Sequence, residues 1–383
     1  MTRTLVRVAI LAWLCVLPAQ AQSLGPFDVE LGQLWMNVKG YDAHAGDVVR
    51  QTEVFTDPPD LVDTRLRTPI RLDMDAGNTF WTEVRYRRNG WGAGVRGWAF
   101  SSDDDTAGGV SSSEPSFTAT TATIVTETVD LWNETLPPVV NELEDSEVSP
   151  VDYRAAGGLR TYTVDFFAWR ELSESDDHRV LLVAGAKTGR LETDQSKGLT
   201  QKAFVFDFFG PGLHLNNFIE LASSADADFL GVGPMIGLEA DTEWRWLRVH
   251  TSASQALLIG DATMSGLFTD VDEITSTADP AGPFMSCTVD LVFQGCLPIE
   301  SSVDFSTSRR VFLPATELRV SLRIGITRNI VVAGNAFAAI WGNAPVPPTF
   351  SVTHASSGPG QDWRQEERAL LFGGVGVAVL VGR

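Results

Sequence analysis

Hydrophobicity with a period of two residues, sustained over runs of ten or more residues, restricts the fold of this chain more than any other feature. In the run 230–240, the apolar residues Leu230, Val232, Ile236 and Leu238 alternate with small or acidic residues. Successive side chains of a β-strand point to opposite faces, so each run predicts a strand with one wholly apolar face. Strands of soluble sheets average about five or six residues, whereas strands that cross a bilayer need about 9 to 11. The runs therefore predict membrane-spanning strands.

The alternation predicts ten such strands. They lie at 27–39, 77–88, 91–101, 157–171, 178–192, 228–241, 244–260, 311–326, 329–342 and 366–382. The run 27–39 changes phase between Leu31 and Leu34 unless it contains a β-bulge. The segment Phe117 to Val129 alternates weakly and could form an extra hairpin arm above the membrane. A count of eight or twelve strands is therefore open beside ten.

The connections between the predicted strands alternate in length. Every second link is a tight turn, at Asn89-Gly90, Leu172 to Asp177, Asp241 to Glu243 and Thr327-Arg328. The other links are long loops, near 40–76, 102–156, 193–227, 262–310 and 343–365. Strict alternation of short and long connections is typical of a barrel with short periplasmic turns and long external loops. We therefore predict an all-β fold, an antiparallel up-and-down transmembrane β-barrel of about ten strands in the cell outer membrane.

Residues 1–21 have the pattern of a secretory signal peptide, which leaves 22–383 as a single barrel domain. Two arginines precede an apolar stretch, and Ala19-Gln20-Ala21 supplies the small residues of a cleavage site. The exported chain then keeps two of its three cysteines, Cys287 and Cys296. In an oxidising compartment this pair predicts one loop disulfide, with two free thiols as the alternative.

The charge of the chain is strongly acidic and unevenly distributed. The 29 basic residues against 49 acidic ones give a formal net charge of −20, which argues against a nucleic-acid partner. Much of the acid falls in two of the predicted loops, most densely at Asp103, Asp104, Asp105, Glu142, Glu144 and Asp145. Such loops either stay hydrated and flexible through their charge or concentrate cations at a channel mouth. They could also bind divalent cations between lipopolysaccharide headgroups.

Charged residues on the predicted strands lie mostly on the face opposite the apolar one. They are Glu83, Arg85, Arg87, Arg96, Asp165, Lys187, Glu239, Arg248, Glu317, Arg319 and Arg323. A charged residue that faces lipid near the midplane costs roughly 2 to 4 kcal/mol, so these side chains are expected to face inward. Our candidates for the lumen wall are Arg85, Arg96, Asp165, Glu239, Arg248, Arg319 and Arg323.

Whether the lumen conducts depends on what fills it. Barrels of about eight strands have interiors just filled by side chains, and 16 to 18 strands leave an aqueous channel. A barrel of ten strands is closer in size to the eight-stranded barrels, whose interiors are filled by side chains. Inward glycines such as Gly92 and Gly94 either leave a narrow path or make room for large partners such as Trp98 and Phe100.

Tryptophans gather near the predicted strand ends. Trp91, Trp169, Trp244 and Trp246 flank short turns, and Trp98 and Trp341 fall near opposite strand ends. Aromatic belts are expected at both membrane interfaces, because the ring is apolar and its N–H can reach water.

Several motifs resemble those of the Legionella-type major outer-membrane proteins. Phe229 to Glu239, followed by a strand ending Leu258 to Asp261, looks like a late hairpin of that family. Tyr162 to Trp169 with Leu181 to Glu192 resembles the preceding hairpin, and Asn89 to Gly94 resembles an early turn. The likeness covers about half of the mature chain through motifs that many barrels share.

This resemblance implies a pore-forming or structural barrel. The barrel-assembly machinery would insert such a protein among outer-membrane lipid and lipopolysaccharide. Such barrels usually end in an aromatic residue that this machinery reads, whereas this chain ends Val379-Leu380-Val381-Gly382-Arg383. This ending departs from the usual terminal assembly signal, although the alternating strand before it remains.

The sequence offers little support for catalysis. Only His250 lies in mid-strand near hydroxyls, at Ser252 and Ser254, and these share the inward phase. No Gly-x-Ser-x-Gly elbow or His-Glu-x-x-His helix is present. We predict no enzyme, cofactor or metal. The expected function is a narrow, weakly cation-selective passive pore for small solutes. The alternative is a non-conducting structural or adhesin-like barrel that acts through its acidic loops.

Overall fold

The computed structural model describes 27–41, 43–56, 61–72, 77–111, 114–118, 121–130, 151–175, 177–203, 213–278, 299–327, 329–355 and 358–382. The predicted signal peptide and the predicted Cys287–Cys296 disulfide lie outside these residues, as do Glu142, Glu144 and Asp145. Asp103, Asp104 and Asp105 fall within a strand. No helix among the described residues is long and apolar enough to cross a membrane.

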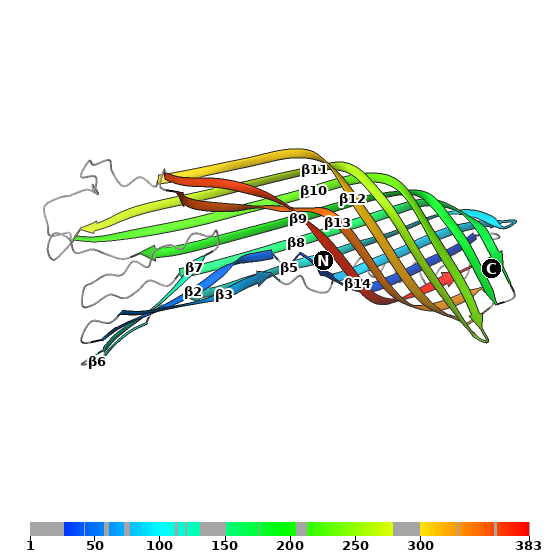
Figure 1. The fold of residues 1–383 in the computed structure, drawn as a ribbon, viewed down its shortest axis with the longest axis horizontal. Helices are drawn as coiled ribbons and strands as arrows, with labels where there is room; N and C mark the ends of the chain where they lie inside the picture. Colours follow the sequence, from blue (N-terminus) through cyan, green and yellow to red (C-terminus); the bar gives the residue numbers. More distant parts are fainter. Residues whose placement is uncertain are drawn as a thin grey trace.

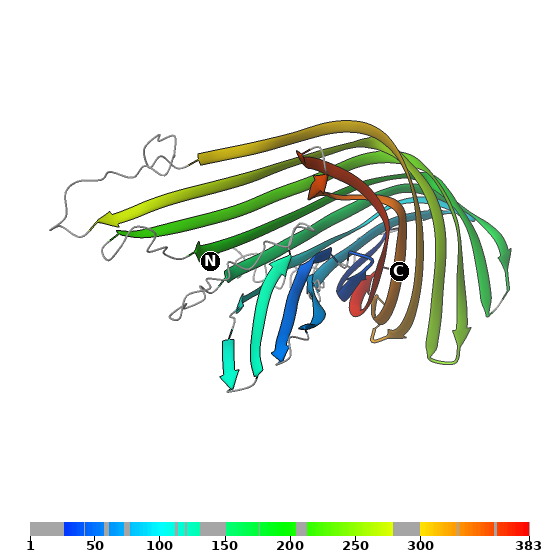
Figure 2. The same ribbon diagram turned by 60° about the vertical axis from the view of Figure 1, so that its left-hand side comes forward.

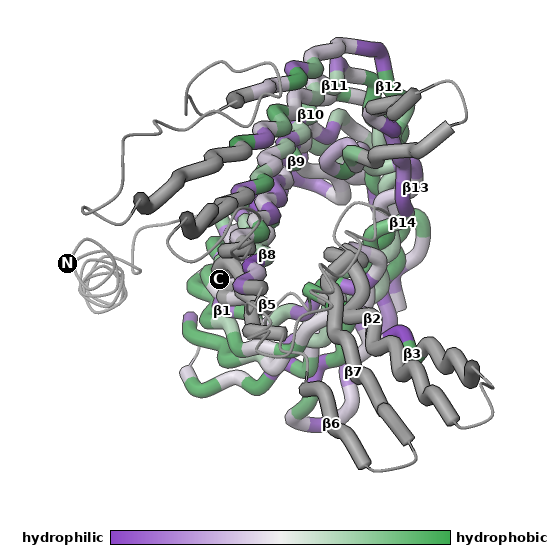
Figure 3. Tube along the Cα trace, turned by 90° about the vertical axis from the view of Figure 1, so that its left-hand side faces the viewer, coloured by the Kyte–Doolittle hydropathy of each residue, from purple (hydrophilic) through white to green (hydrophobic). Residues whose placement is uncertain are grey.

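Ten antiparallel strands form a closed barrel, as the alternation predicts (Figure 1). They are β1 (Phe27–Lys39), β4 (Gly77–Arg88), β5 (Trp91–Ser111), β8 (Val151–Glu174), β9 (His178–Ala203), β10 (Leu213–Trp244), β11 (Leu247–Ala278), β12 (Ile299–Gly325), β13 (Ile330–Ala355) and β14 (Gly358–Val381). Neighbours in sequence pair around the wall, and β1 closes it between β14 and β4. Viewed along its length, the barrel is a ring of strands (Figure 3).

The first strand contains no bulge in its described pairing. β1 pairs without a register shift to both neighbours, for example Leu31 with Val379 and with Thr82. The change in the phase of its apolar residues has a different cause. Leu34 and Met36 lie on the inward face of β1, where they are buried together with Glu30. The interior of the barrel therefore accepts apolar as well as charged side chains.

Tight turns join the strands at one end, which we call the turn end. Asn89 and Gly90 both have positive φ, as the two-residue turns favoured in hairpins require. The turn predicted at Asp241 to Glu243 lies at Arg245-Trp246 instead, because β10 and β11 stay paired as far as Trp244 and Leu247. Arg245 there adopts a φ of 56°.

At the other end, the extension end, the strands run far beyond the predicted limits. β10 and β11 have 32 residues each and remain paired from Trp244–Leu247 to Leu213–Ala278. Such a strand is roughly 100 Å long, several times the ~30 Å of a bilayer core. Much of the predicted loops 193–227 and 262–310 is therefore paired strand, so the barrel wall itself projects from the membrane (Figure 1).

The wall splits within this extension. Pairing between β12 and β13 stops at Ala315–Trp341, and beyond that point β13 pairs only with β14 (Figure 2). Two register shifts follow in β13, on either side of Ala344–Val346. The first spans Gly342 and Asn343, where Asn343 has a φ of 54°, and the second spans Pro347 and Pro348, which have no N–H for the ladder. An ion pair between Arg309 and Glu367, at 2.8 Å, links β12 to β14 across the split.

A second, four-stranded sheet comes from two further predicted loops, 40–76 and 102–156. Its order is β3 (Leu61–Leu72), β2 (Ala43–Thr56), β7 (Thr121–Asp130) and β6 (Glu114–Thr118). The β6–β7 hairpin contains much of the weakly alternating segment Phe117 to Val129 and lies outside the barrel sheet. The barrel count therefore stays at ten.

The outer face of the barrel is apolar between two polar margins. On β10, Leu230, Val232, Ile236 and Leu238 are each more than half exposed. Directly beyond them, toward the extension end, an exposed ion pair joins Arg190 to Asp228 at 2.7 Å. Large apolar side chains exposed around a closed barrel are the surface that lipid requires, so this band marks the membrane-spanning part.

The tryptophans divide between this surface and the interior. Trp91, Trp244 and Trp246 are exposed at the turn end, as an interfacial belt requires. The predicted belt is wrong for Trp98, Trp169 and Trp341, which are buried. Each of these three shares the phase of an inward polar residue on its own strand: Arg96, Asp165 and Asn335.

Candidate functional site: the barrel interior

A continuous network of ion pairs crosses the interior near the turn end. Beginning at β12, Glu317 accepts from Lys187 at 2.8 Å, and Lys187 also pairs with Asp165 at 2.6 Å. Asp165 pairs with Arg96 at 2.6 Å, and Arg96 with Glu239 at 3.2 Å. These five residues come from five different strands, so the chain of charges ties opposite parts of the wall together.

The network continues from Glu239 to the other side of the barrel. Arg85 pairs with Glu239 at 2.6 Å and also with Glu83. Glu83 lies 3.4 Å from Arg319, which also pairs with Glu30. Glu30 then pairs with Arg323 at 3.1 Å. We call this set, with Asp241 and His250, the polar layer.

The end of the polar layer is a histidine–carboxylate pair. Arg323 lies 3.7 Å from Asp241, and His250 Nδ1 lies 3.1 Å from Asp241 Oδ1. His250 was the sequence candidate beside Ser252 and Ser254, but the side chain bonded to it is Asp241. This pair extends a network of ion pairs, which suits a structural role.

The polar layer is almost neutral and largely buried. Its six carboxylates face five permanent cations, and most members are buried. Lys187 is completely buried. Aromatic rings support the guanidinium groups: Arg319 lies 4.2 Å from the ring centre of Trp81, and Arg96 lies 5.1 Å from that of Phe167. Buried charges are tolerated because each has a partner.

An apolar layer fills the interior on the extension side of these charges. Its centre is Trp98, whose ring lies 5.5 Å from the rings of Phe337 and Phe372 and 6.2 Å from that of Trp341. Trp98 also joins the two layers, because its Nε1 donates to Glu317 at 3.0 Å. Further buried side chains complete this apolar layer: Leu34, Met36, Leu159, Leu191, Phe229, Leu258 and Leu313.

A buried tyrosine lies at the outer margin of the apolar layer. Tyr41 follows β1, and its hydroxyl donates to the Asp194 carbonyl at 2.8 Å. Burial raises the pKa of this hydroxyl, so it stays a protonated donor. The contact ties the end of β1 to β9 across the barrel.

The inward glycines make room for large side chains. A Cβ at Gly92 would lie 2.4 Å from Trp169 Cε2, and one at Gly94 would lie 2.7 Å from Phe167 Cζ. The aromatic rings occupy the space that these glycines leave. These two glycines therefore make room for large side chains, which is one of the two alternatives that the sequence left open. Their partners are Trp169 and Phe167 rather than Trp98 and Phe100.

Replacing Gly92 with valine is expected to lower the free energy of unfolding by about 1–3 kcal/mol, the usual cost of overpacking a filled core. The matched control is Gly334→Val on β13, where an added Cβ would meet no atom within 4 Å. Urea unfolding of both variants in lipid vesicles measures the difference. Equal stability of the two variants would contradict a filled interior at Gly92.

Six of the seven lumen candidates lie in the polar layer. They are Arg85, Arg96, Asp165, Glu239, Arg319 and Arg323. Arg248 has the inward phase but lies at the rim of the turn end, half exposed, and pairs with Glu243 at 3.0 Å. Sequence reasoning did not include Glu30 or Asp241. Each lies an even number of residues from inward side chains of its own strand, so the period-two pattern in the sequence would have placed both in the interior.

Comparisons with known proteins give distant structural similarity. No protein-family model matches the chain, and no curated protein matches it. The outer-membrane protease OmpT from Escherichia coli is 10% identical over 94% of this chain and 96% of its own, with a TM-score of 0.43. The P. putida toluene transporter TodX is 7% identical over 95% and 91% of the two chains, with a TM-score of 0.20. Similarity of this degree says nothing of this chain's activity.

Proposed function

We propose that this chain is an outer-membrane barrel with a closed lumen, which anchors and displays a rigid surface structure outside the cell. The observation that carries the proposal is the filled interior, in which an apolar layer lies directly on a paired polar layer. Ten strands are close to the number at which side chains alone fill a barrel. The strand extensions beyond the apolar band would then be the working part of the molecule.

The outer membrane is the location that this architecture favours. Only helices and closed barrels satisfy all backbone hydrogen bonds in lipid, and barrels with short turns at one end are typical of bacterial outer membranes. The acidic composition would keep the extensions hydrated. Outer-membrane lipid and lipopolysaccharide would surround the apolar band.

A weakly cation-selective pore is the second candidate, and the polar layer is the observation that favours it. Arg319 and Arg323 would then line the permeation path, and neutralising both would change ion selectivity. Their pairing with Glu30 argues for the closed alternative, because the charges already satisfy one another.

Conductance of the purified, refolded full chain in planar bilayers distinguishes the two functions. We expect no discrete current steps in potassium chloride from protein that circular dichroism and heat-modified gel mobility show to be folded. A porin of 16 to 18 strands, inserted in the same way, serves as the conducting control. Discrete steps with a preference for cations would overturn the closed barrel and establish the pore.

A further inference from the structure

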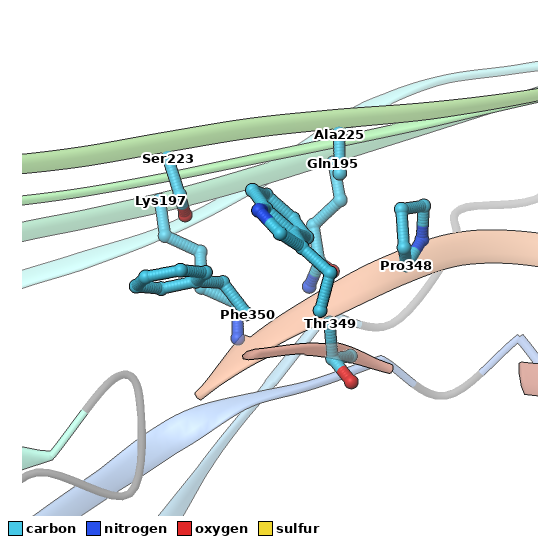
Figure 4. Close-up of a pocket in the computed structure, with 8 residues that line it drawn as sticks. Gln195, Lys197, Ser223, Ala225, Pro348, Thr349 and Phe350 are labelled. Atoms are coloured by element: carbon cyan, nitrogen blue, oxygen red, sulfur yellow. The ribbon is translucent and has the colours of Figure 1, made fainter. Parts of the chain in front are cut away.

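The outer hairpin of β13 and β14 packs against the inner side of the strand extensions. Phe350 of β13 stacks on Phe268 of β11, with ring centres 4.1 Å apart. Trp363 of β14 stacks on Phe305 of β12 at 5.8 Å. The recess that remains beside Phe350, between β13 and the wall, has room for about one water molecule (Figure 4). A larger partner has no space there, whereas the outer surface of the barrel is open to one.

A row of two arginines and one tryptophan lies on this outer surface at the turn end. In the pairing of β4, β5 and β8, Arg88 lies opposite Trp91, and Trp91 lies opposite Arg170. All three side chains are exposed, and they share the phase of the lipid-facing residues on their strands, such as Val95 of β5. Neighbouring strands are about 4.8 Å apart, so the two arginines flank the indole at a backbone separation of roughly 10 Å.

Neither arginine of this row has a carboxylate partner among the described residues. Acidic side chains of the turn end pair with other arginines, on the inward face of the wall. Asp28 lies 3.8 Å from Arg87, and Glu171 lies 3.6 Å from Arg179. The row therefore presents two positive charges to its surroundings that the described part of the chain does not neutralise.

The opposite margin of the apolar band differs in this respect. There, outward arginines lie beside carboxylates: Arg190 pairs with Asp228 at 2.7 Å, and Arg310 lies 3.8 Å from Asp261. The chain as a whole carries a formal net charge of −20, so it has no general attraction for anions. A preference for an anionic partner would have to come from local, unpaired arginines.

We propose that the row Arg88–Trp91–Arg170 binds the headgroup of an anionic phospholipid, such as phosphatidylglycerol, in the leaflet at the turn end. Guanidinium groups form charge-assisted, often bidentate hydrogen bonds with phosphate, and interfacial tryptophan lies at the level of the headgroups. Ala93 and Ala168 are paired neighbours in the next outward row toward the bilayer centre. Their short side chains let the acyl chains of the bound lipid lie close to the wall.

Native mass spectrometry of the folded full chain in a non-ionic detergent, titrated with phosphatidylglycerol, tests the proposal. Phosphatidylcholine with the same acyl chains is the zwitterionic control and is expected to bind more weakly. The double variant Arg88→Gln/Arg170→Gln should weaken the binding of phosphatidylglycerol about 25-fold, because each arginine beside anionic lipid contributes about fivefold. Arg310→Gln removes an exposed outward arginine at the opposite margin, so it is the matched control and should bind as the unaltered chain does.

Four results would overturn the inference. They are equal affinity for the two lipids, unchanged affinity in the double variant, an equal loss in Arg310→Gln, and tighter binding of lipid A than of phosphatidylglycerol, which would assign the row to lipopolysaccharide. Circular dichroism and heat-modified gel mobility confirm that each variant is folded before it is titrated. The inference rests on the proposed place of the chain in the outer membrane but not on a closed lumen, so bilayer conductance and lipid binding can fail independently.

Discussion

Replacing Lys187 with methionine is expected to lower the free energy of unfolding by about 3–5 kcal/mol, the usual cost of removing one partner from a buried ion pair. Lys187 is completely buried, with its Nζ 2.6 Å from Asp165 and 2.8 Å from Glu317. Methionine keeps the length of the side chain but leaves two carboxylates without their shared cation. Asp165 retains Arg96, whereas Glu317 retains, among the described residues, only the hydrogen bond from the Trp98 N–H. Equilibrium unfolding in urea with lipid vesicles measures the loss.

Two further variants test whether the uncompensated charge is the cause. Arg248→Met removes a cation that is half exposed at the rim, where a pair is worth about 0–1 kcal/mol, so its effect should be small. The double variant Lys187→Met/Glu317→Gln removes one stranded carboxylate and should recover about 1 kcal/mol or more, as coupled neighbours do. A loss in Lys187→Met no larger than that in Arg248→Met would mean that water reaches the polar layer.

Replacing Trp98 with alanine is expected to cost about 3–5 kcal/mol, the range for large aromatic truncations in a packed core. The ring contacts Phe337, Trp341 and Phe372, and its N–H donates to Glu317. The change therefore opens a cavity in the apolar layer and also removes a donor from the polar layer. Trp98→Phe keeps most of the ring, so it should lose mainly the bond to the carboxylate, about 1.5–3 kcal/mol.

Trp244→Ala is the matched control for Trp98, because it removes the same side chain from an exposed position at the turn end. Urea unfolding of the three tryptophan variants should rank Trp98→Ala as the least stable and Trp244→Ala as the most stable. Similar losses for Trp98→Ala and Trp244→Ala would contradict the packed apolar layer.

The ten barrel strands could be predicted from sequence because lipid imposes one simple requirement. Every spanning strand needs an apolar outward face, as in Leu318, Val320 and Leu322 of β12, and tight turns such as Asn89-Gly90 have strong local signals. Beyond the lipid this requirement ends. In the outer half of β10, the polar residues Ser224 and Asp226 flank the small apolar Ala225. The difference in hydrophobicity between the two faces is small there, so the segment resembles a polar loop. Its pairing depends on distant partners that a local pattern does not identify.

The interior was harder to predict than the wall. The period-two pattern shows whether a side chain points inward or outward, but not where it lies along the barrel axis. Arg248 has the correct parity, yet it lies at the rim and not within the polar layer. Trp169 shares the phase of Asp165, but its position beside a turn outweighed that signal and suggested an interfacial belt. The division of the interior into a polar and an apolar layer depends on the stagger between strands, which the register fixes only after the barrel closes.

The split between β12 and β13 leaves the outer part of β12 as the border of a sheet. An unpaired border is a template on which a strand of a neighbouring molecule could add, and copies crowded in one membrane would meet at this height. The side chains along it are mostly small and hydrated: Ser301, Ser302, Asp304, Ser306, Ser308 and Arg310 are all exposed. The charged side chains Asp304 and Arg310 disfavour edge-to-edge association. We therefore expect neighbouring copies to lie side by side in one membrane without adding strands to one another.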